Sequence, residues 1–238
     1  MKVNHSIKSP NYDDTVIPVE FVVLHYSACG LQATFELFRD PAKKVSSHLV
    51  ISSSGEVYEV VKSLEGKALR AWHAGKSSWN DGVREWSDFN NFSIGIEIIN
   101  NNGNLIPYHD KQYEALTKVM HLLKKQYPSL QDPKRVIGHE QIAGFRGKVD
   151  PGWLFEWSRF YSSVYPQHPV PERAPALPAS LKEKFEKFLS FVPADEKTRA
   201  EYWKAISSAM EASVSEIRTN RGSPATLPSV PEEPDPAA

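Results

Sequence analysis

Cysteine is almost absent, since Cys29 is the one cysteine in a chain of 238 residues. A single thiol cannot close an intramolecular disulfide, so the fold must be stable without covalent cross-links, as is usual in a reducing compartment. No run of about 18 or more apolar residues occurs, so we expect no membrane span. The first residues also lack the apolar stretch of a secretory signal peptide. These absences together predict a cytoplasmic protein.

An excess of charge of either sign is also missing, because 28 Lys and Arg residues face 29 Asp and Glu residues, for a net charge of -1. The chain therefore has no large positive field to gather phosphate backbones, and we expect no nucleic-acid partner. The 40% hydrophobic and 11% aromatic content excludes a wholly disordered chain. A folded domain of about 150 to 180 residues with an appendage fits this length.

Proline marks the ends of this main domain. Of the 18 prolines, five lie within residues 166–180 and five within residues 223–238. Proline-rich stretches act as semi-rigid spacers or stay disordered. The sequence therefore predicts a main domain over residues 1–165, a proline-rich linker over 166–180, a helical appendage over 181–221 and a disordered tail over 222–238.

The appendage carries two stripes of apolar residues at helical spacing, which predict a helical hairpin with Pro193 between its two helices. The first stripe is Leu181, Phe185, Phe188, Leu189 and Val192, and the second is Trp203, Ile206, Met210, Val214 and Ile217. Two amphipathic helices of this size must bury their apolar faces on something. We expect them to pack on the main domain, to mediate self-association or to hold a protein partner.

Hydrophobic periodicity predicts an α/β fold for the main domain. The predicted strands cover residues 19–24, 45–51, 56–61, 92–99 and 135–138, and the predicted helices cover residues 31–39 and the stretch from an N-cap at Asp110 to Pro128. The second and third strands form a hairpin, because Gly55 between them can take the positive φ that the turn needs. This order predicts a central mixed β-sheet flanked by helices.

Three residues with metal-binding side chains follow predicted strands or lie in a stiff loop. His25 and His139 come directly after strands, where an α/β sheet presents functional groups. Asp150 lies in the loop Lys148–Gly152, which proline stiffens and glycine opens. A histidine taken alone is more often a surface residue or a hydrogen-bonded core residue. Two imidazoles and a carboxylate, however, leave zinc an open fourth position, as in a catalytic site.

A zinc hydrolase also needs a proton carrier and a group that stabilises the oxyanion. Glu97 lies in an apolar strand, where it is either an edge residue pointing to solvent or, beside a metal, the base that takes the proton of water. Lys148 is either an exposed loop lysine or the cation that faces the tetrahedral intermediate. The residues alone leave both alternatives open.

Five segments occur in an order that resembles the zinc-dependent N-acetylmuramoyl-L-alanine amidases of the AmpD type, a group that includes amidase-type phage lysozymes and peptidoglycan recognition proteins. The segments are Val22–Ala28, Val45–Val50, Ala71–Gly75, Asn91–Glu97, and Gly138–His139 followed by Lys148–Gly152. The stretch Ser9–Asp13 resembles the lead-in of the bacterial branch, and the resemblance covers roughly residues 9–162.

The resemblance implies a function and a set of roles. It implies one Zn²⁺ per chain, bound by His25, His139 and Asp150, with Glu97 as general base and acid and Lys148 at the scissile carbonyl. The implied reaction is hydrolysis of the amide bond between N-acetylmuramic acid and L-alanine of peptidoglycan or muropeptides. A non-catalytic peptidoglycan-binding module is the alternative. Endolysin-type release or leaderless export is the alternative to a cytoplasmic recycling role.

The resemblance also separates this chain from the phage-lysozyme branch, which has a cysteine as third ligand where Asp150 stands here, so Cys29 is expected to be a bystander. The spacing from His139 to Asp150 is 11 residues, one more than is usual in bacterial members, and Gly144 or Gly147 is expected to absorb the extra residue. Trp153 stands where those members often have proline.

Further aromatic and histidine residues are candidates for supporting roles. We expect His48 to orient a zinc ligand by hydrogen bonding, a common role for residues behind a metal site. Trp72, His73 and Tyr26 are predicted to bind substrate. The tryptophans in the polar stretch 76–90 are predicted to be exposed on a loop and to form a groove wall; they are Trp79 and Trp86.

Overall fold

The computed structural model describes residues 1–171 and, beyond them, residues 195, 198, 201–202, 204–206, 208–209 and 212. Most of the predicted linker and helical hairpin, and all of the predicted tail, lie outside the described residues. The strands are β1 (Val3–Asn4), β2 (Tyr12–Ile17), β3 (Phe21–Tyr26), β4 (Leu49–Ile51), β5 (Val57–Glu59), β6 (Ala68–Ala71), β7 (Ser78–Asn80), β8 (Glu85–Ser87), β9 (Ser93–Ile98) and β10 (Val136–Gly138). The helices are α1 (Leu31–Arg39), α2 (Asp110–Gln126), α3 (His139–Ala143) and α4 (Trp157–Val164).

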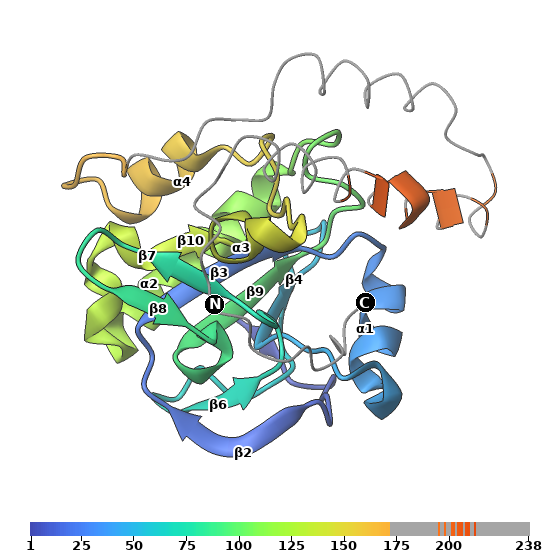
Figure 1. Cartoon of the computed structure of the whole chain (residues 1–238), viewed down its shortest axis with the longest axis horizontal. Coiled ribbons are helices and arrows are strands. Elements are labelled where there is room, and N and C mark those ends of the chain that lie inside the picture. Colours follow the sequence, from blue (N-terminus) through green and yellow to red (C-terminus); the bar gives the residue numbers. More distant parts are fainter. Residues whose placement is uncertain are drawn as a thin grey trace.

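A six-stranded sheet in the order β1-β5-β4-β9-β3-β10 forms the centre of the molecule (Figure 1). Strands β4, β9, β3 and β10 are parallel, whereas β5 runs antiparallel to β4 as the second arm of a hairpin. The turn of that hairpin contains Gly55 at φ +81°, as predicted. The central mixed sheet flanked by helices is therefore confirmed, and the two-stranded sheets β2-β6 and β7-β8 are additions that the sequence did not predict.

Helices α2 and α4 cover one face of the sheet. Alternate residues of β3 and β9, such as Leu24 and Ile96, share a hydrophobic cluster with Leu116 of α2 and Phe160 of α4, and all four are 1% exposed or less. This alternation follows from the two-residue period of a strand. The predicted helix is confirmed, but it begins one residue earlier than expected, because His109 and not Asp110 is its N-cap.

The opposite face is covered by α1 on β4 and β5 and by the segment around β7 and β8. Phe35 and Phe38 of α1 share a cluster with Val50 and Tyr58. Near β3, Phe21 packs edge-on against Trp86, with ring centroids 4.8 Å apart.

The prediction of exposed tryptophans on a loop is wrong. Trp86 is 7% exposed and Trp79 is half-buried in the same aromatic cluster around Phe21. Pairing of β7 with β8 holds the two tryptophans opposite each other, and burial of their rings on Phe21 gives the hairpin its attachment to the sheet.

The described part of the appendage touches the main domain. Ile206 is 5% exposed and belongs to the hydrophobic cluster that α2 and α4 form with the sheet, and Tyr202 packs against that cluster. Of the surfaces proposed for the second apolar stripe, the main domain is therefore the one that these two residues use. Among the residues that the structure describes, no helix combines the length and hydropathy needed to span a bilayer.

Candidate metal centre and active site

The carboxyl ends of the parallel strands bring the predicted site residues together. His25 of β3 and Glu97 of β9 are register partners on neighbouring strands. Because Leu24 and Ile96 point toward α2 and α4, the alternation of the strands turns His25 and Glu97 to the other face. His139 follows β10, the strand next to β3, as the first residue of α3.

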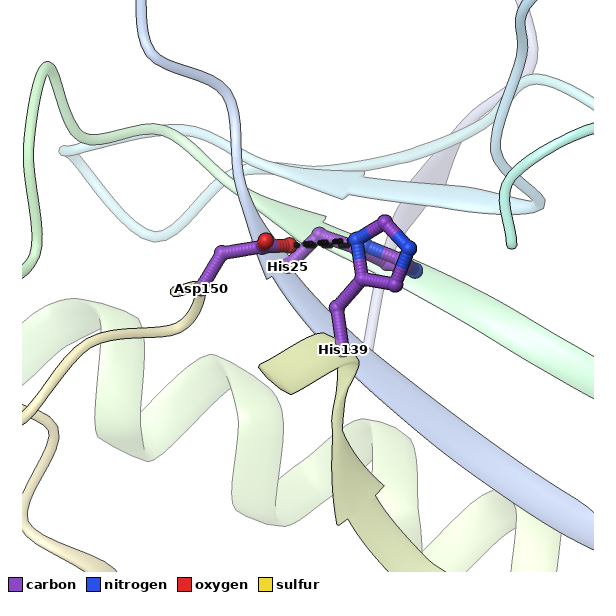
Figure 2. A group of neighbouring side chains, drawn as sticks. All are labelled: His25, His139 and Asp150. Atoms are coloured by element: carbon purple, nitrogen blue, oxygen red, sulfur yellow. Dashed lines mark hydrogen bonds and ion pairs between the residues drawn. The ribbon is translucent and has the colours of Figure 1, made fainter. Parts of the chain in front are cut away.

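His25, His139 and Asp150 converge on one point, as Figure 2 shows. Oδ2 of Asp150 lies 2.9 Å from Nδ1 of His25 and 3.0 Å from Nδ1 of His139. One ligand atom from each residue lies within 4.8 Å of the other two. The side chains are nearly closed off from solvent, with exposed fractions of 3%, 6% and 6%. The three residues predicted to hold the metal are therefore adjacent and preformed.

The loop that carries Asp150 is held from both sides. The backbone carbonyl of Asp150 accepts a hydrogen bond from the amide of Glu140 at 3.0 Å, and the hydroxyl of Tyr108 donates to the carbonyl of Pro151 at 2.6 Å. Between His139 and Asp150 the chain makes a 3₁₀ turn over Gly144–Arg146 and then reverses at Gly147, at φ +84°. Glycine takes this left-handed conformation without steric cost. That these glycines absorb the longer spacing noted in the sequence stays a prediction.

Burial and mutual contact set the charges of this group. Burial, with a contribution from His139, lowers the pKa of His25 to about 4, so its imidazole is neutral near pH 7 and offers a lone pair. Burial by itself would raise the pKa of Asp150, but the nearby His139 and His25 hold it well below its usual value. An ionised carboxylate beside two imidazoles, closed off from water, is a donor set that fits Zn²⁺.

Glu97 and Lys148 lie within the electrostatic reach of this group. Burial, followed by repulsion from Asp150, raises the pKa of Glu97 to about 8, while Lys148 pulls it down. Lys148 is half-buried, and its charge also acts on His25. Glu97 is 9% exposed, so the alternative of an edge glutamate pointing to solvent is wrong. A carboxyl group that titrates near neutral pH is suited to exchange protons with a substrate.

The predicted role of His48 is wrong. The histidine lies just before β4 and not within a strand, and each of its ring nitrogens meets a backbone group. Nδ1 accepts from the amide of Gly95 at 3.0 Å, and Nε2 lies 2.7 Å from the carbonyl oxygen of Leu69. His48 therefore holds strands together and does not hydrogen-bond a member of the metal group.

His73 was predicted to bind substrate, and this stays a prediction. The side chain is 8% exposed and points inward, with Nδ1 3.1 Å from Nε2 of His25. His73, and not His48, therefore contacts a ring nitrogen of the metal group. The one signal in the sequence was Gly95, because a Cβ there would clash with the imidazole of His73.

The substrate-binding roles of Trp72 and Tyr26 likewise stay predictions. Trp72 is half-buried, and its Nε1 donates to a carboxylate oxygen of Asp13 at 3.0 Å. Tyr26 ends β3 next to His25 and is 7% exposed.

Cys29 is half-buried at the start of α1, where its Sγ lies 3.3 Å from Oγ1 of Thr34.

Comparison with known proteins agrees with the geometry. Residues 15–153 match the Amidase_2 family, described as N-acetylmuramoyl-L-alanine amidase. The chain is 30% identical over 178 residues to the 1,6-anhydro-N-acetylmuramyl-L-alanine amidase AmpD of Haemophilus influenzae, with coverage of 66% of this chain and 90% of the relative. It is 40% identical over 120 residues to the AmpD of Enterobacter cloacae, covering 50% of this chain and 57% of that protein.

A solved structure leads to the same family. The crystal structure of a selenomethionine derivative of AmpD superposes with a TM-score of 0.55 and 31% identity, covering 68% of this chain and 94% of that chain. The family match covers more than half of the 238 residues and includes all three residues of the metal group. The chain therefore belongs to the N-acetylmuramoyl-L-alanine amidase family and is an amidase of the AmpD type.

Proposed function

We propose that the protein uses one bound Zn²⁺ to hydrolyse the amide bond between N-acetylmuramic acid and L-alanine in muropeptides. The observation that carries this proposal is the convergence of His25, His139 and Asp150 beside the buried Glu97. Three protein ligands leave a fourth position for water or substrate. Bound zinc supplies a water of lowered pKa and polarises the scissile carbonyl.

Glu97 is the group that moves the proton. In the metal-free protein burial raises its pKa to about 8, and the positive charge of bound zinc would favour the carboxylate, which is the form that takes a proton. As a carboxylate it takes a proton from the attacking water, and as an acid it gives that proton to the nitrogen of L-alanine when the amide C–N bond breaks. The products are the carboxyl group of the muramic acid and the free amine of the peptide.

Lys148 has an electrostatic role in the same step. Lys148 is half-buried, and its charge acts on both His25 and Glu97, which supports a place for it beside the amide that is cleaved. Negative charge develops on the carbonyl oxygen in the transition state, and a fixed cation stabilises that charge more than it stabilises the neutral amide.

Muropeptides with a 1,6-anhydro end are the proposed substrate class. Support comes from the names of the Haemophilus influenzae and Enterobacter cloacae relatives, both of which are 1,6-anhydro-N-acetylmuramyl-L-alanine amidases. Intact sacculi serve as the second substrate in the test. Activity on anhydro-muropeptide and none on sacculi is the expected result, whereas comparable activity on both contradicts the proposed substrate class.

The experiment follows peptide release from purified anhydro-muropeptide by chromatography. We expect a chelator to bring release to background and stoichiometric Zn²⁺ to restore it. Glu97→Gln keeps the size of the side chain and removes the proton carrier, so we expect release to fall by about 10²- to 10⁴-fold. Glu85→Gln, at an exposed glutamate of β8, is the matched control and should retain full activity.

Two results would contradict the proposal in different ways. Turnover by Glu97→Gln at the wild-type rate would show that Glu97 is not the group that transfers the proton. A folded wild-type protein that binds no zinc and releases no peptide would contradict the hydrolytic function and favour the recognition module.

A further inference from the structure

The turn between β6 and β7 contacts both histidines of the metal group from behind. His73 Nδ1 lies 3.1 Å from Nε2 of His25, and the backbone carbonyl oxygen of Ala74 lies 3.2 Å from Nε2 of His139. In each ligand the nitrogen involved is the one turned away from Asp150, since Nδ1 faces the carboxylate. Two consecutive residues therefore meet the outer nitrogens of both imidazoles.

The carbonyl of Ala74 fixes the tautomer of His139 directly. A carbonyl oxygen accepts hydrogen bonds and cannot donate, so Nε2 of His139 must carry the proton. With a metal bound, the opposite nitrogen, Nδ1, then offers a lone pair to the metal in place of a proton to the carboxylate of Asp150. Arg146 donates to the same carbonyl oxygen at 3.3 Å, which agrees with its use as an acceptor.

The tautomer of His25 is fixed by a carbonyl oxygen as well, but a second imidazole, that of His73, lies between the two. The far nitrogen of His73, Nε2, lies 3.3 Å from both the carbonyl oxygen and the hydroxyl of Ser93; the carbonyl only accepts, and the hydroxyl donates its own proton to the carbonyl of Phe89. Nε2 of His73 must therefore carry its proton. The ring is 8% exposed, and the contacts described for its two nitrogens are with Ser93 and His25, so no carboxylate among them offsets the cost of a second, buried proton and its other nitrogen is unprotonated. Nδ1 of His73 then accepts from Nε2 of His25, and with a metal bound Nδ1 of His25 offers it a lone pair in place of a proton to Asp150.

The position of His73 is itself fixed by the fold. The side-chain oxygen of Asn90 accepts from the amides of His73 and Ala74, at 3.0 and 2.8 Å. The imidazole lies over Gly95 of β9, where a Cβ would be 2.7 Å from Nδ1 of His73. Asn90 is 8% exposed, so this clamp is shielded from solvent. The ring is thus held by contacts on its backbone, its face and its far nitrogen.

We propose that His73 is a positioning residue for His25. Its Nε2 donates to the carbonyl of Ser93, its Nδ1 accepts from Nε2 of His25, and this chain of hydrogen bonds holds His25 in the tautomer that can bind a metal through Nδ1. The inference rests on the proposed zinc site. Residues that orient a histidine ligand through its other nitrogen raise metal affinity, and their loss costs about 10- to 100-fold in binding.

A pair of variants with the same branching tests the relay. His73→Leu fills a similar space but offers no acceptor, whereas His73→Asn places an oxygen at the position of Nδ1. Zinc affinity is measured by competition with a chromogenic chelator. We expect His73→Leu to weaken zinc binding by about 10- to 100-fold and His73→Asn to recover most of that loss.

His48→Asn is the control, because His48 is another buried imidazole, with its ring centroid 5.6 Å from that of His73, and its nitrogens meet backbone groups. It should lose stability and keep its zinc affinity. Equal losses of affinity in His48→Asn and His73→Leu would mean that any disturbance of the core has this effect, and would overturn the relay.

Nitrogen-15 NMR of the zinc-loaded wild-type protein gives a readout that needs no variant to fold. We expect His73 as the Nε2–H tautomer, and an Nδ1–H tautomer would overturn the inference. Wild-type zinc affinity in His73→Leu would overturn the proposed role of His73 but leave the proposed zinc site intact, because the metal would then bind without His73. Wild-type protein that binds no zinc would overturn the proposed function together with this inference.

Discussion

Replacement of Glu97 by glutamine should stabilise the metal-free protein while it removes catalysis. Glu97 is 9% exposed, and burial and the negative charge of Asp150 raise its pKa from 4.5 to about 8. At pH 7 the folded protein must therefore keep a proton on this group that the unfolded chain gives up to water. Glutamine has the same size and is neutral at every pH, so the variant avoids this penalty.

The sign and size of the effect follow from proton linkage. Between pH 4.5 and about 8 the folded state binds more protons at Glu97 than the unfolded state does, so stability falls as the pH rises. The cost is about 1.4 kcal/mol for each pH unit above the unfolded value. We therefore expect Glu97 to cost on the order of 3 kcal/mol at pH 7 and 4 kcal/mol at pH 8, and almost nothing at pH 4.5.

Urea unfolding of wild type and Glu97→Gln in the presence of a chelator measures this cost. The variant should gain stability between pH 5 and pH 8 relative to wild type, with parallel unfolding slopes. The exposed Glu85→Gln control should show no such trend. A constant difference between wild type and Glu97→Gln over this pH range would refute the reasoning, because a pH-independent effect reports packing and not ionisation.

Three further predictions concern packing near the site. Gly95→Ala places a methyl group 2.7 Å from Nδ1 of His73, so urea unfolding should show a loss of about 1–3 kcal/mol and chelator competition a weaker zinc site; unchanged zinc affinity would mean that the imidazole moves freely. Trp86→Ala removes a ring that packs on Phe21, so urea unfolding should show a loss of about 3–5 kcal/mol, and KM for muropeptide should be unchanged. A raised KM at full stability would mean that Trp86 binds substrate. Leu49→Ala empties a fully buried position in β4 and should cost about 2–5 kcal/mol; a cost under about 1 kcal/mol would contradict its place in the core.

Elements with a strong local pattern were predictable from the sequence. The predicted helix over residues 31–39 coincides with α1, and the predicted strand over 92–99 contains β9 with one residue to spare at each end. Both owe their formation to the period of their own apolar residues. The short strands β7 and β8 have three residues each. They form because they pair with each other and pack on Phe21, and no hydrophobic pattern within these short segments predicts that tertiary contact.

The sequence by itself determined the chemistry of the site. His25 and His139 come at or just after apolar strands, and parallel strands bring their carboxyl ends to one edge of the sheet, so the donor set of two imidazoles and a carboxylate could be read from order and spacing. The types and positions of these three residues predicted a metal site, while the role of Glu97 in the neighbouring strand stayed open until the resemblance to the amidases was considered.

Only the tertiary structure decided which histidine supports that site. His48 and His73 both lie in polar, turn-flanked sequence, and nothing local distinguishes a ring that meets backbone from one that meets His25. The difference arises because the His73 turn folds over β9 at Gly95, where the missing side chain admits an imidazole. Which nitrogen meets which acceptor depends on ångström-scale distances between segments far apart in the chain, and the fold alone sets those distances.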